Sequence, residues 1–148
     1  MATATFHKYL QFVEDLAKKV HNLNSDTLKL ALTNVAPNDV THTVLADVTE
    51  LGAGSGYSAG GPTAAFVSGV QTAGVYKLIL ADAAILAAGG TIGPFRYVVL
   101  YNSTPATKPL IGWWDYNDIN PATPNVTLAD GESFLADLSA SLGAITIT

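Results

Sequence analysis

The stretch TLKLALT, residues 27–33, carries a leucine at every second position. Leu28, Leu30 and Leu32 point to one side of an extended chain, because successive side chains alternate between the two faces of a strand. Polar and small residues take the opposite side. This period of two predicts a half-buried β-strand, and it marks a change from the helical period that precedes it.

Residues 6–21 are predicted to form an N-terminal α-helix. Between Phe6 and Val20 apolar residues recur at steps of three and four, and polar side chains take the other face. Thr5 is the expected N-cap. Phe12 lies off the apolar stripe, so either a second surface covers its ring or the ring is exposed. Phe12 is therefore a candidate interface residue.

The rest of the chain reads as short strands separated by turn residues. Asp130-Gly131 lies between two alternating runs and predicts a β-hairpin. Because no second helical pattern intervenes, we expect a mainly β chain: an antiparallel, jelly-roll-like β-sandwich over residues 27–148, with the one N-terminal helix, in a single domain of residues 1–148. The further strands are expected at residues 41–49, 64–70, 75–86 with a bend at 81–83, 95–101, 110–116, 125–128, 133–138 and 144–147.

Composition narrows the possible partners. Only 13% of the 148 residues are charged, against roughly 25% in a typical globular chain. Seven basic residues against twelve acidic ones make nucleic acid an unexpected partner. The longest apolar stretch, residues 78–95, contains Asp82, the pair Gly89-Gly90 and Pro94, so we expect no membrane association. The shortage of charge in the β region predicts that a partner covers part of the sheet.

Motifs with catalytic or ligand-binding chemistry are weak. The glycine-rich stretch at residues 52–62 has the spacing of a dinucleotide loop, but Gly61-Pro62 blocks the helix that such a site needs, so a flexible or tightly turned loop is expected. His7, His21 and His42 are scattered and are expected at the solvated surface. Asp115, Asn117 and Asp118 could supply oxygen ligands, without the register of a calcium loop. We therefore predict no catalytic residue, cofactor or metal.

One arginine and two tryptophans are candidate interface residues. Arg96 lies in FRYVVLY, residues 95–101, which is apolar on both faces and predicts a central strand covered by the other sheet and by the helix or a neighbouring subunit. A covered arginine needs a carboxylate or carbonyl partner, within the chain or across an interface. Trp113 and Trp114 are neighbours in a strand, so their rings face opposite sides. One is expected in the core and the other under a loop or at an interface.

Several blocks, taken in order, resemble a family of short virion proteins of tailed bacteriophages. The resemblance covers nearly the whole chain and rests on block order, because the family supplies no catalytic signature. The blocks are TLKLALTNVAP (27–37), VLADVTEL (44–51), GSGYSAGG (54–61), VYKLILADAAI (75–85), GTIGPFRYVVLYN (90–102), PLIGWWDY (109–116) and LADGESF (128–134).

The resemblance implies a non-enzymatic virion structural protein, a capsid decoration or cement protein that binds and stabilises the assembled head. Its expected partners are the major capsid protein or other virion proteins and further copies of itself in a homo-oligomer. Its expected location is the virion, assembled in the bacterial host cytoplasm. Two alternatives stay open: a tail or fibre component of the same particle, and a carbohydrate-binding β-sandwich module with a tryptophan as stacking platform.

Overall fold

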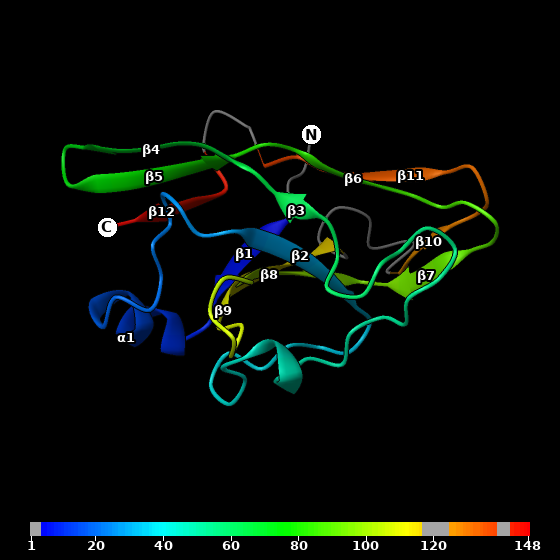
Figure 1. The fold of residues 1–148 in the computed structure, drawn as a ribbon, viewed down its shortest axis with the longest axis horizontal. Helices are drawn as coiled ribbons and strands as arrows, with labels where there is room; N and C mark the ends of the chain where they lie inside the picture. The colour runs from blue at the N-terminus through cyan, green and yellow to red at the C-terminus, as the bar shows by residue number, and fades with distance from the viewer. Residues whose placement is uncertain (1–3, 117–124, 139–142) are drawn as a thin grey trace.

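Strand β2 (Leu28–Thr33), formed by the alternating segment, lies inside a five-stranded antiparallel sheet with the order β1-β9-β8-β2-β3. The computed structural model describes residues 4–116, 125–138 and 143–148. We call this five-stranded sheet the central sheet (Figure 1). Its other strands are β1 (Thr5–Lys8), β3 (Thr63–Ala64), β8 (Tyr97–Asn102) and β9 (Leu110–Asp115).

A second layer, which we call the outer ribbon, lies over one face of the central sheet (Figure 1). Its strands β5, β6 and β7 follow one another along the chain and pair with β12, β11 and β10 in reverse order, while β4 pairs with the free side of β5. Their bounds are β4 (Phe66–Thr72), β5 (Val75–Leu80), β6 (Ala83–Leu86), β7 (Ile92–Phe95), β10 (Val126–Leu128), β11 (Ser133–Ala136) and β12 (Ile145–Ile147).

The main hydrophobic core lies between the two layers. Leu28, Leu30 and Leu32 contribute to it from β2, and Leu78 and Leu80 contribute from β5; each is at most 1% exposed. A fully buried leucine stabilises the fold by about 1.5–3 kcal/mol, so the leucine alternation that opens the β region is a large part of the reason why the layers stay together. The prediction of a mainly β chain with antiparallel sheets and one α-helix is confirmed.

The opposite face of the central sheet is also covered, by the chain itself. Val99 and Tyr101 of β8 pack there with Leu110, Tyr9 and Val48, and Val48 follows a 3₁₀ turn, η1 (Leu45–Asp47). All six residues of β8 are buried. The central strand is therefore covered on both faces as predicted, but the second cover includes residues of the 34–51 segment and needs no neighbouring subunit. The strand expected at residues 41–49 is wrong, because this segment turns through η1 instead.

The N-terminal helix is shorter than predicted. Residues Thr5–Lys8 form β1, which pairs with β9, and only Gln11–Ala17 form the helix α1. Phe6 and His7 lie opposite Trp114 and Trp113, and these ring contacts outweigh a helical period that local sequence alone favours. A helix of two turns is marginal by itself in water, so strand pairing with β9 decides the conformation of residues 5–8.

The end of α1 also differs from the expectation. The backbone N–H of Lys19 donates to the Leu16 carbonyl and that of Val20 donates to the Asp15 carbonyl, which is a Schellman motif. Lys19 takes the left-handed conformation that this motif requires, with φ of 62°. The helix therefore ends before the His21-Asn22 boundary that the sequence predicts.

The hairpin predicted at Asp130-Gly131 is wrong. These residues form a turn, but the strands that flank it, β10 and β11, pair with β7 and β6 and not with each other. The turn lies beside the Gly89-Gly90 segment, where the Gly89 N–H donates to Asp130 Oδ1 at 2.9 Å. Each strand has its own partner across the ribbon, and that pairing overrides the local turn signal. The bend expected at residues 81–83 is confirmed between β5 and β6.

Candidate interaction surface

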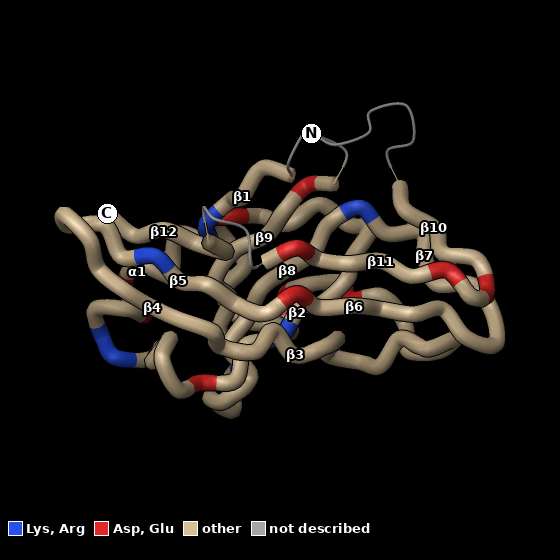
Figure 2. Tube along the Cα trace, turned by 90° about the horizontal axis from the view of Figure 1, so that it is seen from above, with Lys and Arg blue, Asp and Glu red and all other residues tan. Residues whose placement is uncertain are grey.

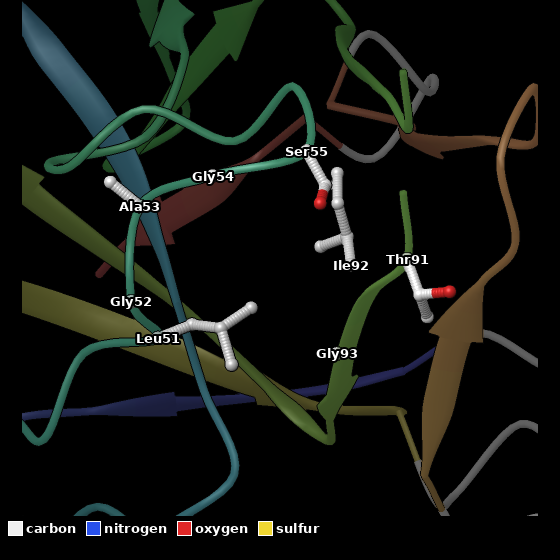
Figure 3. A pocket seen from close by; sticks show the side chains of 8 residues that line it. All are labelled: Leu51, Gly52, Ala53, Gly54, Ser55, Thr91, Ile92 and Gly93. Carbon is white, nitrogen blue, oxygen red and sulfur yellow. The ribbon is translucent and has the colours of Figure 1, made fainter. Parts of the chain in front are cut away.

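A surface hollow of about 240 Å³ lies between residues 51–55 and residues 91–93 (Figure 3). Its polar side chains are the hydroxyls of Ser55 and Thr91, and none of its lining residues is titratable. A hydroxyl needs an adjacent base to become a nucleophile at neutral pH. The hollow therefore lacks the groups for acid–base chemistry.

The glycine-rich loop beside the hollow is held firmly against the central sheet. The Leu32 N–H donates to the Tyr57 hydroxyl, which in turn donates to Glu50 Oε1 at 2.7 Å. The Tyr101 hydroxyl donates to the Gly60 carbonyl at 2.7 Å. Burial, and secondarily the Glu50 charge, raise the pKa of Tyr101 to about 12, so its phenol stays a donor at neutral pH. The loop is therefore a tightly turned structural element, which is one of the two expected alternatives.

Arg96 is paired within its own chain. It separates β7 from β8, so the single strand expected over residues 95–101 is broken at the point where the chain passes from the outer ribbon to the central sheet. Its guanidinium donates two hydrogen bonds of 2.8 Å to the Asp115 carboxylate, a bidentate geometry that only arginine provides. Asp115, one of the expected oxygen ligands, is thus engaged by Arg96, while Asn117 and Asp118 lie outside the described residues.

The two tryptophans face opposite sides of β9. Trp114 is 9% exposed and packs in the main core, with its ring centroid 5.1 Å from that of Phe6. Trp113 is half-buried on the other face, where the His7 ring stacks on it at 4.1 Å and Asp39 accepts its indole N–H at 2.6 Å. His7 therefore covers one face of the Trp113 ring, and Asp39 engages its N–H.

Phe12 is buried by its own chain. Its ring is 2% exposed, belongs to the main core, and lies 5.2 Å from the His21 ring. The neighbours that the helical pattern placed on the apolar stripe, Leu10 and Val13, are instead more than half exposed. The difference follows from the start of α1 at Gln11, which turns a different face of the helix toward the core.

His21 is buried, which contradicts its expected place at the solvated surface. Its Nδ1 lies 3.2 Å from Asn102 Nδ2, and Asn102 Oδ1 accepts the Thr104 N–H. The Asn102 amide is thereby oriented as a donor toward His21, so Nδ1 must be an unprotonated acceptor. Nε2 carries the proton and has no hydrogen-bond partner within the described part of the chain; Asp15 Oδ2 is 3.9 Å away. Desolvation lowers the pKa of His21, against an opposing attraction from Asp15 and Asp26.

We expect stability to fall in mild acid because of His21. A folded-state pKa below the unfolded value of about 6.5 means that the unfolded chain binds the proton first. The stabilisation is complete above pH 6.5 and is lost as the pH falls toward the lowered folded pKa, at up to about 1.4 kcal/mol per pH unit for one proton. Chemical denaturation from pH 7.5 down to 5 measures this slope. The unfolding free energy of His21→Gln should vary less with pH between these limits. An equal slope in both proteins would contradict the role of His21.

The exposed side of the outer ribbon is apolar. Ala84 on β6 lies directly opposite Leu135 on β11, and Leu86 lies diagonal to it; Leu86 and Leu135 are 55% and 58% exposed. We call Ala84, Leu86 and Leu135 the outer ribbon face. Lys77 is the only charged residue within β4, β5, β6 and β11. The exposed acids Asp82, Glu132 and Asp137 directly flank β6 and β11, and Figure 2 shows acidic positions at the ends of these two strands.

Sequence reasoning did not identify the outer ribbon face. Its signal is present in AAIL, residues 83–86, and SFLA, residues 133–136, where both alternating sets contain apolar residues. The chain itself covers both faces of the central sheet. A partner of the predicted kind would therefore fit on the outer ribbon face.

Comparison with known proteins identifies no relative: no family model, curated protein or solved structure matches this chain. In the described ranges no helix has the length and apolar character to cross a membrane. Nor do those ranges contain a cluster of three or more His, Asp or Glu side chains with metal-binding geometry.

Proposed function

We propose that this chain is a structural protein of a tailed-phage virion, a capsid decoration or cement protein that docks on the assembled head through the outer ribbon face. The observation that carries the proposal is this apolar surface, on which Leu86 and Leu135 are more than half exposed. The hollow between residues 51–55 and 91–93 has no titratable lining. The order of sequence blocks supports the virion assignment. The jelly-roll-like topology belongs to this proposal and is a prediction.

The mechanism is linkage between binding and assembly. A protein that binds the assembled shell and not its dissociated subunits stabilises the shell by its binding free energy at every occupied site. Burying apolar side chains such as Leu86 and Leu135 contributes about 25 cal/mol per Å² of area removed from water. Charge is depleted at the centre of such interfaces, which fits the single lysine of the four ribbon strands.

The test is reconstitution on heads that lack this protein. Adding the protein should raise the temperature at which the heads rupture and release DNA, and heads that rupture at the same temperature with and without it would exclude the cement role. Labelling on the tail in a few copies, instead of on the head in many, would favour the alternative of a tail or fibre component.

We expect Leu135→Glu to reduce head occupancy tenfold or more, since burying an unpaired carboxylate costs well over the roughly 1.4 kcal/mol that a tenfold change represents. The matched control is Val40→Glu, which adds the same charge at a 71% exposed position outside the ribbon. Occupancy is measured by co-sedimentation with heads. Equal loss in the two variants would show that the outer ribbon face is not the docking surface.

A further inference from the structure

Strand β4 is an open sheet edge. It lies at the end of the order β12-β5-β4, and Figure 1 shows it as the outermost strand of the β4–β5 hairpin. Among the residues that the structure describes, Phe66–Thr72 make no backbone hydrogen bonds except those to β5. Edge strands in natural proteins are usually shortened or protected by lysine or proline. β4 has seven residues, FVSGVQT, with neither a charge nor a proline, and its one β-bulge, between Phe66 and Ser68, lies outside the Ser68–Thr72 segment.

The hairpin turn determines which backbone groups of β4 are open. Ala73 and Gly74 both have positive φ, 52° and 84°, which is the geometry of a two-residue type I′ turn. Thr72 and Val75 therefore form a hydrogen-bonded pair, and such pairs alternate along the ladder. It follows that the N–H and C=O groups of Gly69 and Gln71 point away from β5.

The open edge is complementary to itself. When two β4 strands run antiparallel about a two-fold axis through Val70, Gly69 of one copy pairs with Gln71 of the other, and each pair exchanges two hydrogen bonds. Val70, which is 59% exposed, then meets its own equivalent. Ser68 faces Thr72 of the other copy, a favourable cross-strand pair. These contacts bring an apolar pair and two hydroxyl pairs together without placing any charge opposite another.

Charge does not oppose this contact. The nearest charge to the axis on the hairpin strands is Lys77, opposite Val70 on β5. Its equivalent in the other copy is three strand spacings away, roughly 14 Å, which exceeds the screening length of about 8 Å at physiological salt. The overall charge of −5 is therefore not concentrated where the two copies meet.

We infer that a second copy of this chain binds at the β4 edge, joining the two outer ribbons into one continuous antiparallel sheet. The seven residues of β4 are fewer than the roughly 20–30 per side of a standard interface, so the dimer is concentration-dependent in dilute solution. It would be reinforced wherever another structure holds copies side by side, because their effective concentration is then high. This inference does not depend on the proposed virion function.

The test is the mass of the full chain by sedimentation velocity over a roughly hundredfold range of concentration. The wild type should shift from monomer toward dimer, and Val70→Glu should stay monomeric because two carboxylates then face each other at the axis. That substitution preserves the hairpin, since Lys77 lies directly opposite position 70. Val40→Glu, the same change away from β4, should dimerise like the wild type. A wild type that is monomeric throughout, or a Val70→Glu variant that dimerises equally, would overturn the inference.

A second measurement tests the register without adding charge. The chain has no cysteine, so Val70→Cys introduces a single thiol. At a non-hydrogen-bonded antiparallel pair the two Cα atoms are about 4.5 Å apart, within the range that a disulfide spans. Mild oxidation should therefore crosslink Val70→Cys much faster than Val40→Cys, with slowed amide exchange at Gly69 and Gln71 at high concentration. Equal crosslinking rates would reject pairing at Val70, while the head-binding result for Leu135→Glu would be unaffected.

Discussion

Replacing Gly61 with alanine is expected to cost about 4 kcal/mol or more of unfolding free energy, a large part of the roughly 5–15 kcal/mol that holds a typical domain folded. A Cβ at Gly61 would overlap the carbonyl oxygen of Leu30, and the residue has φ of +70°. The obstacle is the backbone of β2 in the central sheet, so it cannot move aside as a flexible side chain would. The Leu30 N–H also donates to the Pro62 carbonyl at 3.0 Å, and separating the loop from β2 would break that bond.

The matched control is Gly74→Ala. Gly74 has a similar φ of +84°, but nothing lies within 4 Å of the position of a Cβ. The Gly74→Ala variant should lose only about 1–2 kcal/mol of unfolding free energy, which is what the left-handed conformation costs an L-residue. Urea denaturation followed by far-UV circular dichroism measures both variants. If the urea midpoints of the two variants differ little, the loop accommodates the added Cβ at position 61, and overlap with the Leu30 carbonyl does not destabilise the protein.

Trp114→Ala is expected to destabilise the protein by about 3–5 kcal/mol, because it leaves a cavity in the main core. The Trp114 ring packs between the layers and contacts Phe6 of β1, so its loss also weakens the pairing that places β1 on the edge of the central sheet. The variant should unfold at a markedly lower urea concentration, and the amides of Phe6 and His7 should exchange faster.

Trp113→Ala provides the comparison within the same strand. It removes a half-buried ring, its stacking on His7 and its hydrogen bond to Asp39, for which we expect about 1–2 kcal/mol. Trp114→Phe should recover part of the loss at position 114 because it refills most of the cavity. If Trp113→Ala proved the more damaging variant, the assignment of Trp114 to the core between the layers would be contradicted.

Most strands could be predicted because their alternation is local. The inward side of the β2 leucines and the opposite orientations of Trp113 and Trp114 follow from the period of two. The N-terminal segment could not be predicted in the same way. The period of Phe6 to Val20 suits a helix, yet strand pairing with β9 and burial of aromatic rings give residues 5–8 a better alternative. Local preferences are small compared with such contacts.

The candidate interaction surfaces, too, could be predicted only in part from the sequence. The shortage of charge indicated that a partner would cover part of the sheet, but composition does not identify which surface the partner would cover. The segment that includes Val48 covers the face of β8 that a neighbour was expected to cover. The surface left open lies on the outer ribbon, around Leu86 and Leu135. Arg96, a candidate for an intersubunit pair, is engaged by Asp115 of its own chain.

The sequence by itself determined the β class of this protein and the inward face of β2, because both depend on side-chain alternation along the chain. The tertiary structure alone decided that residues 5–8 form a strand, that His21 is buried against Asn102, and that β4 is left as an uncharged edge. Each of these depends on a partner more than 70 positions away or on the place of a strand within its sheet, and neither is encoded in local periodicity.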